Sequence, residues 1–159
     1  MGYIMDERQF GDVRVGDVMA TEMPIVEVST ALCKVARMLR RASHVWVVQE
    51  RGSREVLGIV TEREFLELLS PMPDKEYATG MIRTKSLLHG DMSTADEFMT
   101  KPVVSCSPST NVETALEILR EKRIRRLAVI DDGRLVGEIS LKGIIAAYYI
   151  SSCSMTDSQ

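Results

Sequence analysis

An internal repeat constrains the fold of this chain more than any other feature. Similar residues recur in the same order after Met19 and again after Met99, and the spacing between partners changes only slightly. The matched groups are Met19 with Met99; Pro24, Ile25 and Val26 with Pro102, Val103 and Val104; Ser29 with Ser107; Leu32, Val35, Ala36 and Leu39 with Val112, Ala115, Leu116 and Leu119; Val47 and Val48 with Val129 and Ile130; Leu57 and Gly58 with Val136 and Gly137; and Thr61 with Ser140. Solenoid units recur every ~20 to 50 residues, so this repeat is too long to be one. The pattern predicts two similar α/β subdomains, with any ligand site occurring as a related pair.

The composition allows a folded core and does not favour a polyanionic partner. Hydrophobic residues make up 45% of the 159 residues. One copy of about 55 residues would bury too little surface to be stable by itself, so we expect the two copies to pack together and share a core. The formal net charge of −3 gives no overall attraction to nucleic acid or to an anionic membrane, although it leaves room for a local basic patch.

Each copy is predicted to form a strand, a helix, two strands and a second helix. In the first copy, alternation over 25–28 indicates a strand, and the apolar spacing over 32–39 indicates an amphipathic helix. Two runs rich in β-branched residues, 45–48 and 56–60, are typical of strands. A capping-box pattern over 61–64 then begins the last helix.

The second copy repeats this order with clearer signals. A capping-box pattern over 110–113 begins its first helix, and Asp132-Gly133 marks a tight hairpin between strands at 127–130 and 135–139. Ser140 is expected to cap the last helix. The inner face of that helix is expected to carry Leu141, Ile144, Ile145 and Tyr148.

These elements place the first subdomain at 12–70 and the second at 94–150. Residues 71–93 are less regular and are expected to be a linker or a peripheral element. The polar tail, 151–159, is expected to be disordered.

No arrangement of residues in the sequence is typical of catalysis or of metal binding. His44 and His89 are the only histidines, and no triad, zinc motif or phosphate-binding glycine loop accompanies them, so we expect a protein that is not an enzyme. The three cysteines include no CxxC pair, which favours reduced thiols. Because there is no signal-peptide core and no apolar run long enough to span a bilayer, we expect a cytoplasmic protein without membrane contact.

The join between the return strand and the last helix is the strongest candidate for a binding site. Thr61 is followed by Arg63 in the first copy, and Ser140 is followed by Lys142 in the second. A hydroxyl at a helix start, with free backbone N–H groups and a base two residues later, can hold an anion. The alternative is that Thr61 and Ser140 only cap helices, and the recurrence in both copies leaves the two interpretations about evenly balanced.

Taken together, these motifs resemble the cystathionine-β-synthase (CBS) domain family, in which tandem domains form the Bateman module. The resemblance is carried by Val18-Met19 and Phe98-Met99, by Pro102-Val103-Val104, by the run 124–131, and by the joins Gly58 to Thr61 and Gly137 to Ser140. It implies an α+β fold with two tandem β-α-β-β-α subdomains, related by a pseudo-twofold axis and packed through their sheets. It also implies two clefts between the copies.

The resemblance further implies an adenosine-containing ligand such as AMP, ADP, ATP or S-adenosylmethionine. In this family a hydroxyl contacts phosphate, and an Asp three residues later contacts the ribose. Thr61 and Ser140 match the hydroxyl, whereas Glu64 and Gly143 stand at the Asp position. Ribose recognition is therefore expected through Glu64 and not through Gly143, and one occupied cleft is preferred to two.

Other ligand contacts follow from the same resemblance. Adenine is expected against Pro24, Ile25 and Val26 and against Pro102, Val103 and Val104, although each of these side chains fits an ordinary strand core equally well. Arg125 and Arg126 are candidates for phosphate contacts, and their counterparts in the first copy are Ser43 and His44.

The sequence is therefore interpreted as a non-enzymatic regulatory module that forms a homodimer, needs no cofactor and signals to an unidentified partner protein. Two alternatives remain open. The chain is an interaction module without a ligand, which Glu64 and Gly143 favour, or it binds nucleic acid through the basic cluster Arg120–Arg126. The acidic net charge and the absence of interleaved aromatic residues count against nucleic acid.

Overall fold

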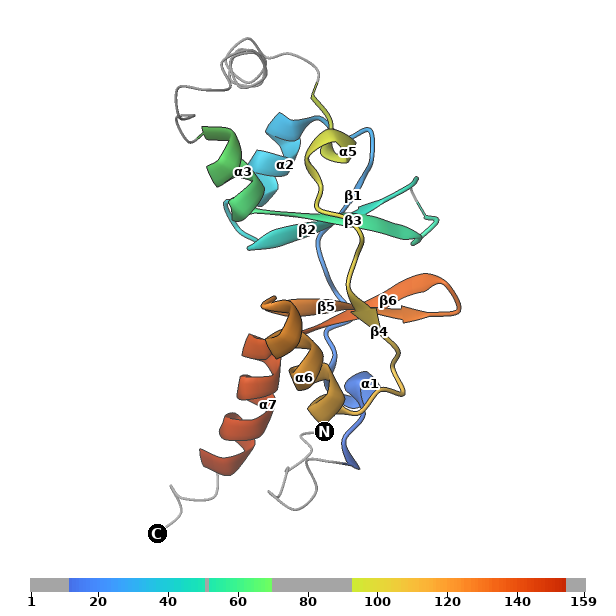
Figure 1. The fold of residues 1–159 in the computed structure, drawn as a ribbon, viewed down its shortest axis with the longest axis vertical. Coiled ribbons are helices and arrows are strands. Elements are labelled where there is room, and N and C mark those ends of the chain that lie inside the picture. The colour runs from blue at the N-terminus through green and yellow to red at the C-terminus, as the bar shows by residue number, and fades with distance from the viewer. Residues whose placement is uncertain (1–11, 51, 70–92, 154–159) are drawn as a thin grey trace. The chain divides into compact units, whose positions relative to one another are not determined.

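The computed structural model describes residues 12–50, 52–69 and 93–153, with side chains as far as Tyr149. The chain divides into two compact units (Figure 1). The first unit consists of described residues 24–69 and 93–103, and the second unit consists of residues 12–23 and 104–153. None of the described helices is long and apolar enough to cross a membrane.

The first unit is a three-stranded sheet covered by helices on one face (Figure 1). Its elements are β1 (Ile25–Glu27), α2 (Leu32–Met38), β2 (His44–Val48), β3 (Val56–Thr61), α3 (Glu62–Leu69) and α5 (Ala95–Phe98). Strand β2 lies in the centre, parallel to β1 and antiparallel to β3. All residues of β2 are buried, and this explains why Val45, Trp46, Val47 and Val48 follow each other without an alternating polar residue.

The second unit has the same topology. Its elements are α1 (Val15–Val18), β4 (Ser105–Cys106), α6 (Val112–Lys122), β5 (Arg126–Asp131), β6 (Arg134–Ser140) and α7 (Leu141–Cys153). Strand β5 is central, parallel to β4 and antiparallel to β6. Both sheets carry an irregularity at the same place, between Val47 and Val48 and between Val129 and Ile130. The predicted order of strand, helix, strand, strand and helix is thus confirmed in both copies.

Several boundaries differ from the sequence-based expectation. Helix α7 continues through Cys153, past the boundary predicted at residue 150, because its apolar run is followed by serines and not by a helix breaker. Asn111, and not Thr110, is the N-cap of α6, and its side chain accepts a hydrogen bond from the Thr114 N–H. The short helices α1 and α5 were not predicted, because four residues are too few to show a helical period. Residues 71–92 and 154–159 lie outside the described residues.

The segments that open the two copies are exchanged between the units. Residues 12–23 belong to the unit of the second copy, and residues 93–103 belong to the unit of the first. Ala20 forms a two-way backbone bridge with Glu138, and Thr100 forms the same bridge with Ile59. The compact units therefore do not coincide with the sequence repeats.

This exchange explains why each copy contains a Met and a Gly at fixed places. A Cβ atom on Gly58 would lie 2.5 Å from the Met99 sulfur, and one on Gly137 would lie 2.7 Å from the Met19 sulfur. Only a residue without a side chain allows so close an approach. Each opening Met therefore covers the glycine of the other copy's return strand.

Each unit has its own apolar core, completed by the exchanged segment. The first core is formed by Val26, Leu32, Val35, Val45, Val47, Val60, Leu68, Ala95 and Met99. The second is formed by Val15, Val112, Ala115, Leu119, Leu127, Val129, Ile139 and Ile144. The structure therefore has two separate cores and not the one shared core that was expected, and each core includes residues from the exchanged segment: Ala95 and Met99 in one cluster and Val15 in the other.

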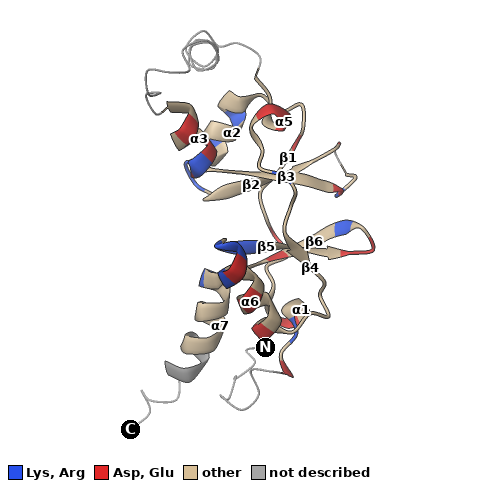
Figure 2. Cartoon of the chain, viewed as in Figure 1, with Lys and Arg blue, Asp and Glu red and all other residues tan. Residues whose placement is uncertain are grey.

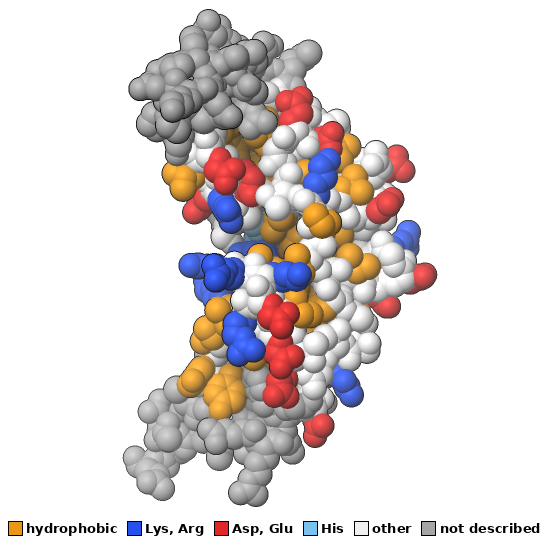
Figure 3. Space-filling view, viewed as in Figure 1, with side chains coloured by type: hydrophobic (Ala, Val, Ile, Leu, Met, Phe, Trp, Pro, Cys, Tyr) orange, Lys and Arg blue, Asp and Glu red, His pale blue; other side chains and the backbone are white. Residues whose placement is uncertain are grey.

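The buried face of α7 is narrower than predicted. Ile144 is 3% exposed, whereas Leu141 and Ile145 are 42% and 48% exposed. Successive helical residues point about 100° apart, so Ile144 and Ile145 cannot both enter a narrow contact with the sheet. The prediction was wrong for Leu141 and Ile145, which leave apolar side chains at the surface along α7 (Figure 3).

Candidate functional site

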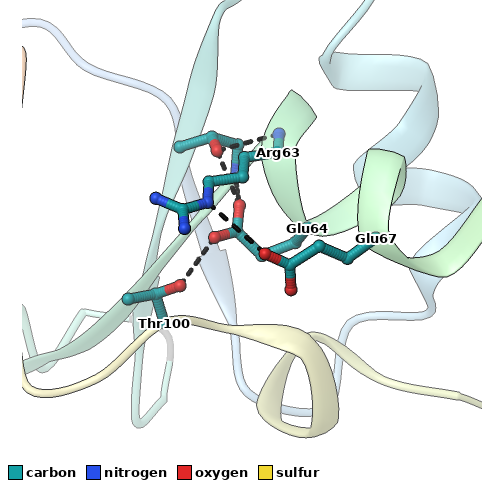
Figure 4. A network of polar contacts seen from close by, with 5 residues as sticks. Arg63, Glu64, Glu67 and Thr100 are labelled. Atoms are coloured by element: carbon teal, nitrogen blue, oxygen red, sulfur yellow. Dashed lines mark hydrogen bonds and ion pairs between the residues drawn. The ribbon is translucent and has the colours of Figure 1, made fainter. Parts of the chain in front are cut away.

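The first candidate site is the turn from β3 into α3, here called the Thr61 corner (Figure 4). The backbone N–H of Thr61 donates to Glu64 Oε2 at 2.7 Å, and the Thr61 hydroxyl donates to the same oxygen at 2.6 Å. The hydroxyl also accepts from the Arg63 N–H at 3.1 Å. The carboxylate half of the predicted capping box is therefore present, and Glu64 Oε2 accepts hydrogen bonds from both the N–H and the hydroxyl of Thr61.

The other oxygen of Glu64 is held from the exchanged segment. The Thr100 hydroxyl donates to Glu64 Oε1 at 2.6 Å. Partial burial would raise the pKa of Glu64, but the hydrogen bonds from Thr100 and Thr61 outweigh it and hold the pKa below its ordinary value of 4.5. Glu64 is therefore a fixed carboxylate at the N-terminus of α3.

The charges at the Thr61 corner oppose a second anion. Arg63, whose charge was expected to favour phosphate, instead pairs with Glu67, with Nε and Oε1 3.4 Å apart (Figure 4). Both side chains are largely exposed, so this pair contributes little to stability. Because Glu64 occupies the first turn of α3, an incoming phosphate would meet a negative charge. It would also meet a Thr61 hydroxyl that already donates its hydrogen bond to Glu64.

The second candidate site, the turn from β6 into α7, is here called the Ser140 corner. The Gly143 N–H donates to Ser140 Oγ at 3.0 Å, and the Leu141 N–H donates to the Arg125 carbonyl at 2.9 Å. Within the part of the chain that the structure describes, the Ser140 hydroxyl donates no hydrogen bond. Gly143 stands where Glu64 stands in the first copy, so the first turn of α7 has no carboxylate at this position, while the carboxylate of Glu138, two residues before Ser140, pairs with Arg126.

The two corners differ at three equivalent positions at once. Thr61, Glu64 and Thr100 form a bonded set in the first unit, and their counterparts are Ser140, Gly143 and Ala20. Sequence reasoning missed Thr100, because only the exchange of segments brings it to Glu64. The sequence signal that could have indicated it is the difference between Thr100 and Ala20, which occupy equivalent positions directly after the matched methionines Met99 and Met19.

A basic residue faces the hydroxyl across the sheet in both units. His44 is the strand partner of Thr61, and Arg126 is the strand partner of Ser140. His44 is 4% exposed, with Nδ1 3.4 Å from the Ser43 hydroxyl and its ring edge-on to Trp46 at 5.6 Å. The predicted equivalence of the two positions is thus visible in the strand register.

Arg126 is paired inside its own unit. Its Nη1 lies 3.7 Å from Glu138 Oε1, and the two side chains are 19% and 12% exposed. Burial lowers the pKa of Arg126 and the nearby Arg125 lowers it further, while Glu138 opposes the shift. Arg125 and Lys142 are exposed, so they are the more accessible cations at the Ser140 corner. Figure 2 shows Lys and Arg residues gathered where α6 ends and β5 begins.

The predicted adenine contacts divide between the units at the bond from Val103 to Val104. The Pro24 carbonyl accepts from the Trp46 N–H at 2.8 Å, and the Val104 carbonyl accepts from the Ala128 N–H at 3.2 Å. Val26 is 6% exposed and belongs to the core of the first unit, so its side chain packs internally.

The predicted ligand-binding residues are divided between the two units. Pro24, Ile25, Val26, His44, Thr61, Arg63, Glu64, Pro102 and Val103 lie in the first unit, and Val104, Arg125, Arg126, Ser140 and Lys142 lie in the second. Pro102 is exposed and follows a cis peptide bond, while Ile25 and Val103 are half-buried.

Comparison with known proteins agrees with this architecture. The sequence model of the CBS domain matches residues 15–71 and 95–150. The mitochondrial CBS domain-containing protein CBSX3 of Arabidopsis thaliana is 26% identical over 152 residues, covering 90% of this chain and 68% of that protein.

Two crystal structures show the same fold at low sequence identity. The structure of CBSX2 in complex with AMP has a TM-score of 0.65 and 21% identity, covering 92% of this chain and 98% of CBSX2. The CBS domain pair of protein MJ0100, in complex with 5′-methylthioadenosine and S-adenosyl-L-methionine, has a TM-score of 0.60 and 20% identity, covering 83% of this chain and 96% of that pair. The chain therefore belongs to the CBS domain family and contains two CBS domains in tandem.

Proposed function

We propose that this chain is a regulatory, non-catalytic module that binds an adenosine-containing ligand and signals to a partner protein by a change of conformation. The class of ligand is supported by the relatives, since CBSX2 was crystallised with AMP and MJ0100 with 5′-methylthioadenosine and S-adenosyl-L-methionine. A ligand shifts a conformational equilibrium only through its different affinities for the two states. The ligand of this chain must therefore bind one arrangement of the module more tightly than another.

The observation that carries the proposal is the difference between the two corners. At the Ser140 corner, among the described residues, the hydroxyl donates no hydrogen bond, Gly143 stands in place of Glu64, and Arg125 and Lys142 supply exposed positive charge. At the Thr61 corner the Thr61 hydroxyl already donates its hydrogen bond to Glu64. We infer that a phosphate group binds at the Ser140 corner and that the Thr61 corner disfavours phosphate.

The proposal includes a homodimer. Helix α3 exposes Leu66 and Leu69, which are 66% and 68% exposed, and α7 exposes Leu141, Ile145 and Tyr149. Neighbouring apolar side chains at this level of exposure are typical of surfaces that another protein covers. We infer that a second copy covers them.

The ligand proposal is tested by titrating the full chain with AMP, ATP, S-adenosylmethionine and adenosine in a calorimeter. Ser140→Ala is expected to weaken AMP or ATP by about tenfold or more, because a hydrogen bond to a charged group is worth about 1.5–3 kcal/mol. Arg125→Ala is expected to weaken the phosphate-bearing ligands relative to adenosine. Thr61→Val is the matched control and is expected to change nucleotide affinity less than twofold or so, because its donor is already in use.

One alternative function has an observation in its favour. The Thr61 corner is fully bonded within its own unit, as expected for an interaction module that has no ligand. If no compound in the panel binds to protein that mass spectrometry shows to be free of co-purified nucleotide, the interaction module is the better interpretation. If Thr61→Val abolishes nucleotide binding and Ser140→Ala does not, the assignment of the phosphate to the Ser140 corner is wrong.

A further inference from the structure

The two copies carry opposite charges on equivalent faces of their first long helices. In α2, Lys34 and Arg37 are exposed three residues apart on one face of the helix, and Arg40 and Arg41 are exposed in the turn that follows it. No acidic residue occurs between Glu27 and Glu50. This surface of the first unit is therefore basic, although the chain as a whole is acidic.

The basic face of α2 forms one wall of an open groove. The groove has a volume of about 650 Å³, and Lys34, Arg37, Arg40 and Arg41 are among its lining residues. Among the described residues, no acidic side chain lines it. Within the described part of the first unit, none of these four cations forms an ion pair. Four unpaired cations around one hollow repel each other, so an acidic partner would relieve this repulsion.

The corresponding face of α6 is acidic. Glu113, Glu117 and Glu121 are exposed and follow an i, i+4, i+8 spacing. A groove of about 540 Å³ beside this helix is lined by Glu113 and Glu117 together with apolar residues and Arg120. Within the described part of the second unit, none of the three glutamates forms an ion pair.

The register of the repeat shows that the charge is reversed at matched positions. Leu32 corresponds to Val112 and Leu39 corresponds to Leu119, so Arg37 corresponds to Glu117 and Arg41 corresponds to Glu121. Arg40 and Arg120 keep the same charge, and Lys34 corresponds to the uncharged Thr114, so the reversal is confined to these two pairs. The inner faces of both helices remain apolar, with Leu32 and Val35 matching Val112 and Ala115.

Packing within a unit does not require this reversal, because all of the charged side chains concerned are exposed. Two surfaces of opposite charge attract each other, whereas each would repel a copy of itself. We propose that the basic face of α2 in one molecule docks against the acidic face of α6 in a second copy of the chain. This pairing rests on the self-association included in the proposed function and determines which helix meets which.

The test is a charge exchange measured by sedimentation velocity on the full chain. Arg37→Glu with Arg41→Glu is expected to weaken self-association by about tenfold or more, and Glu117→Arg with Glu121→Arg by a similar factor, because like charges then face each other. An equimolar mixture of the two variants is expected to associate as the wild type does, because each α2 again meets an α6 of opposite charge. Association of the wild type is expected to weaken as salt rises.

The matched control is Glu50→Arg with Glu55→Arg, which makes the same change of charge at exposed positions between β2 and β3. This control is expected to associate as the wild type does, and circular dichroism shows whether each variant is folded. If both exchange variants associate as strongly as the wild type, or if their mixture does not recover, the pairing is wrong, while ligand binding by calorimetry is unaffected. If Arg37→Glu with Arg41→Glu instead loses binding to a labelled single-stranded oligonucleotide and keeps its self-association, the groove is a nucleic-acid site and the proposal is overturned.

Discussion

Replacing Glu64 by alanine should destabilise the first unit by an amount that the structure allows us to work out. The carboxylate caps the first turn of α3 through Thr61 and joins this turn to the exchanged segment through Thr100. Loss of the cap costs about 1 kcal/mol. Loss of the hydrogen bond from Thr100 adds about 1 kcal/mol. This is less than is usual for a hydrogen bond to a charged group, because water can reach the exposed Thr100. We therefore expect a loss of about 2 kcal/mol in the free energy of unfolding.

Trp46 provides the assay, because it is the single tryptophan of the chain and is 1% exposed in the core sheet of the first unit. Its fluorescence follows unfolding in urea. Arg63→Ala is the matched control on the same turn, since it removes only an ion pair between exposed side chains and should cost less than about 0.5 kcal/mol. A double substitution of Glu64 and Thr100 should cost less than the sum of the single substitutions, because both remove the same bond.

The pH dependence gives a second, independent check. The pKa of Glu64 is lowered in the folded state, so its charged form stabilises the fold. This contribution is fully present above the ordinary value of 4.5 and is lost as the pH falls through the lower folded-state pKa. The advantage of the wild type over Glu64→Gln should therefore be constant near neutral pH and shrink in acid. The reasoning is refuted if Glu64→Ala costs no more than Arg63→Ala, or if the difference from Glu64→Gln is the same at pH values on both sides of this range.

Two further predictions concern packing and thiol reactivity. Gly137→Ala should cost about 2 kcal/mol in the free energy of unfolding, because the new Cβ would lie 2.7 Å from the Ala20 carbonyl oxygen, which is backbone and cannot rotate away. Gly58→Ala should be partly rescued by Met99→Ala, since all three nearest atoms belong to the Met99 side chain, and no rescue in urea denaturation would contradict this account. In a Cys153→Ser background, Cys33 should react quickly with a thiol reagent at pH 8 and Cys106 slowly, because Cys33 is exposed and burial raises the pKa of Cys106 to about 11. Equal rates for Cys33 and Cys106, read from the mass of each labelled peptide, would show that the Cys106 thiol is accessible.

The sequence was sufficient to predict the element order and the turns that form the two corners, because these depend on local periodicity and on capping residues. The capping box from Thr61 to Glu64 is an example, since both residues lie in one helical turn. The contact from Thr100 to Glu64 was not predictable in the same way, because the two residues are far apart in the chain and no local pattern joins them. For the same reason, the unit boundaries at Met23 and Val103 could not be predicted from the positions of the repeats.

Because the opening segments are exchanged, the protein cannot be divided between its two repeats without removing residues from both cores. A fragment cut between the two repeats would keep Val15 and Met19 without the strand they cover, and would lose Ala95 and Met99 from the core of the first unit. The stretch from Pro24 to Val103 contains every core residue named for the first unit, whereas the core of the second unit needs Val15 from residues 12–23 as well as residues after Val103. The stretch that was duplicated in evolution is therefore not the stretch that folds, and recombination at the repeat boundary would yield two incomplete cores.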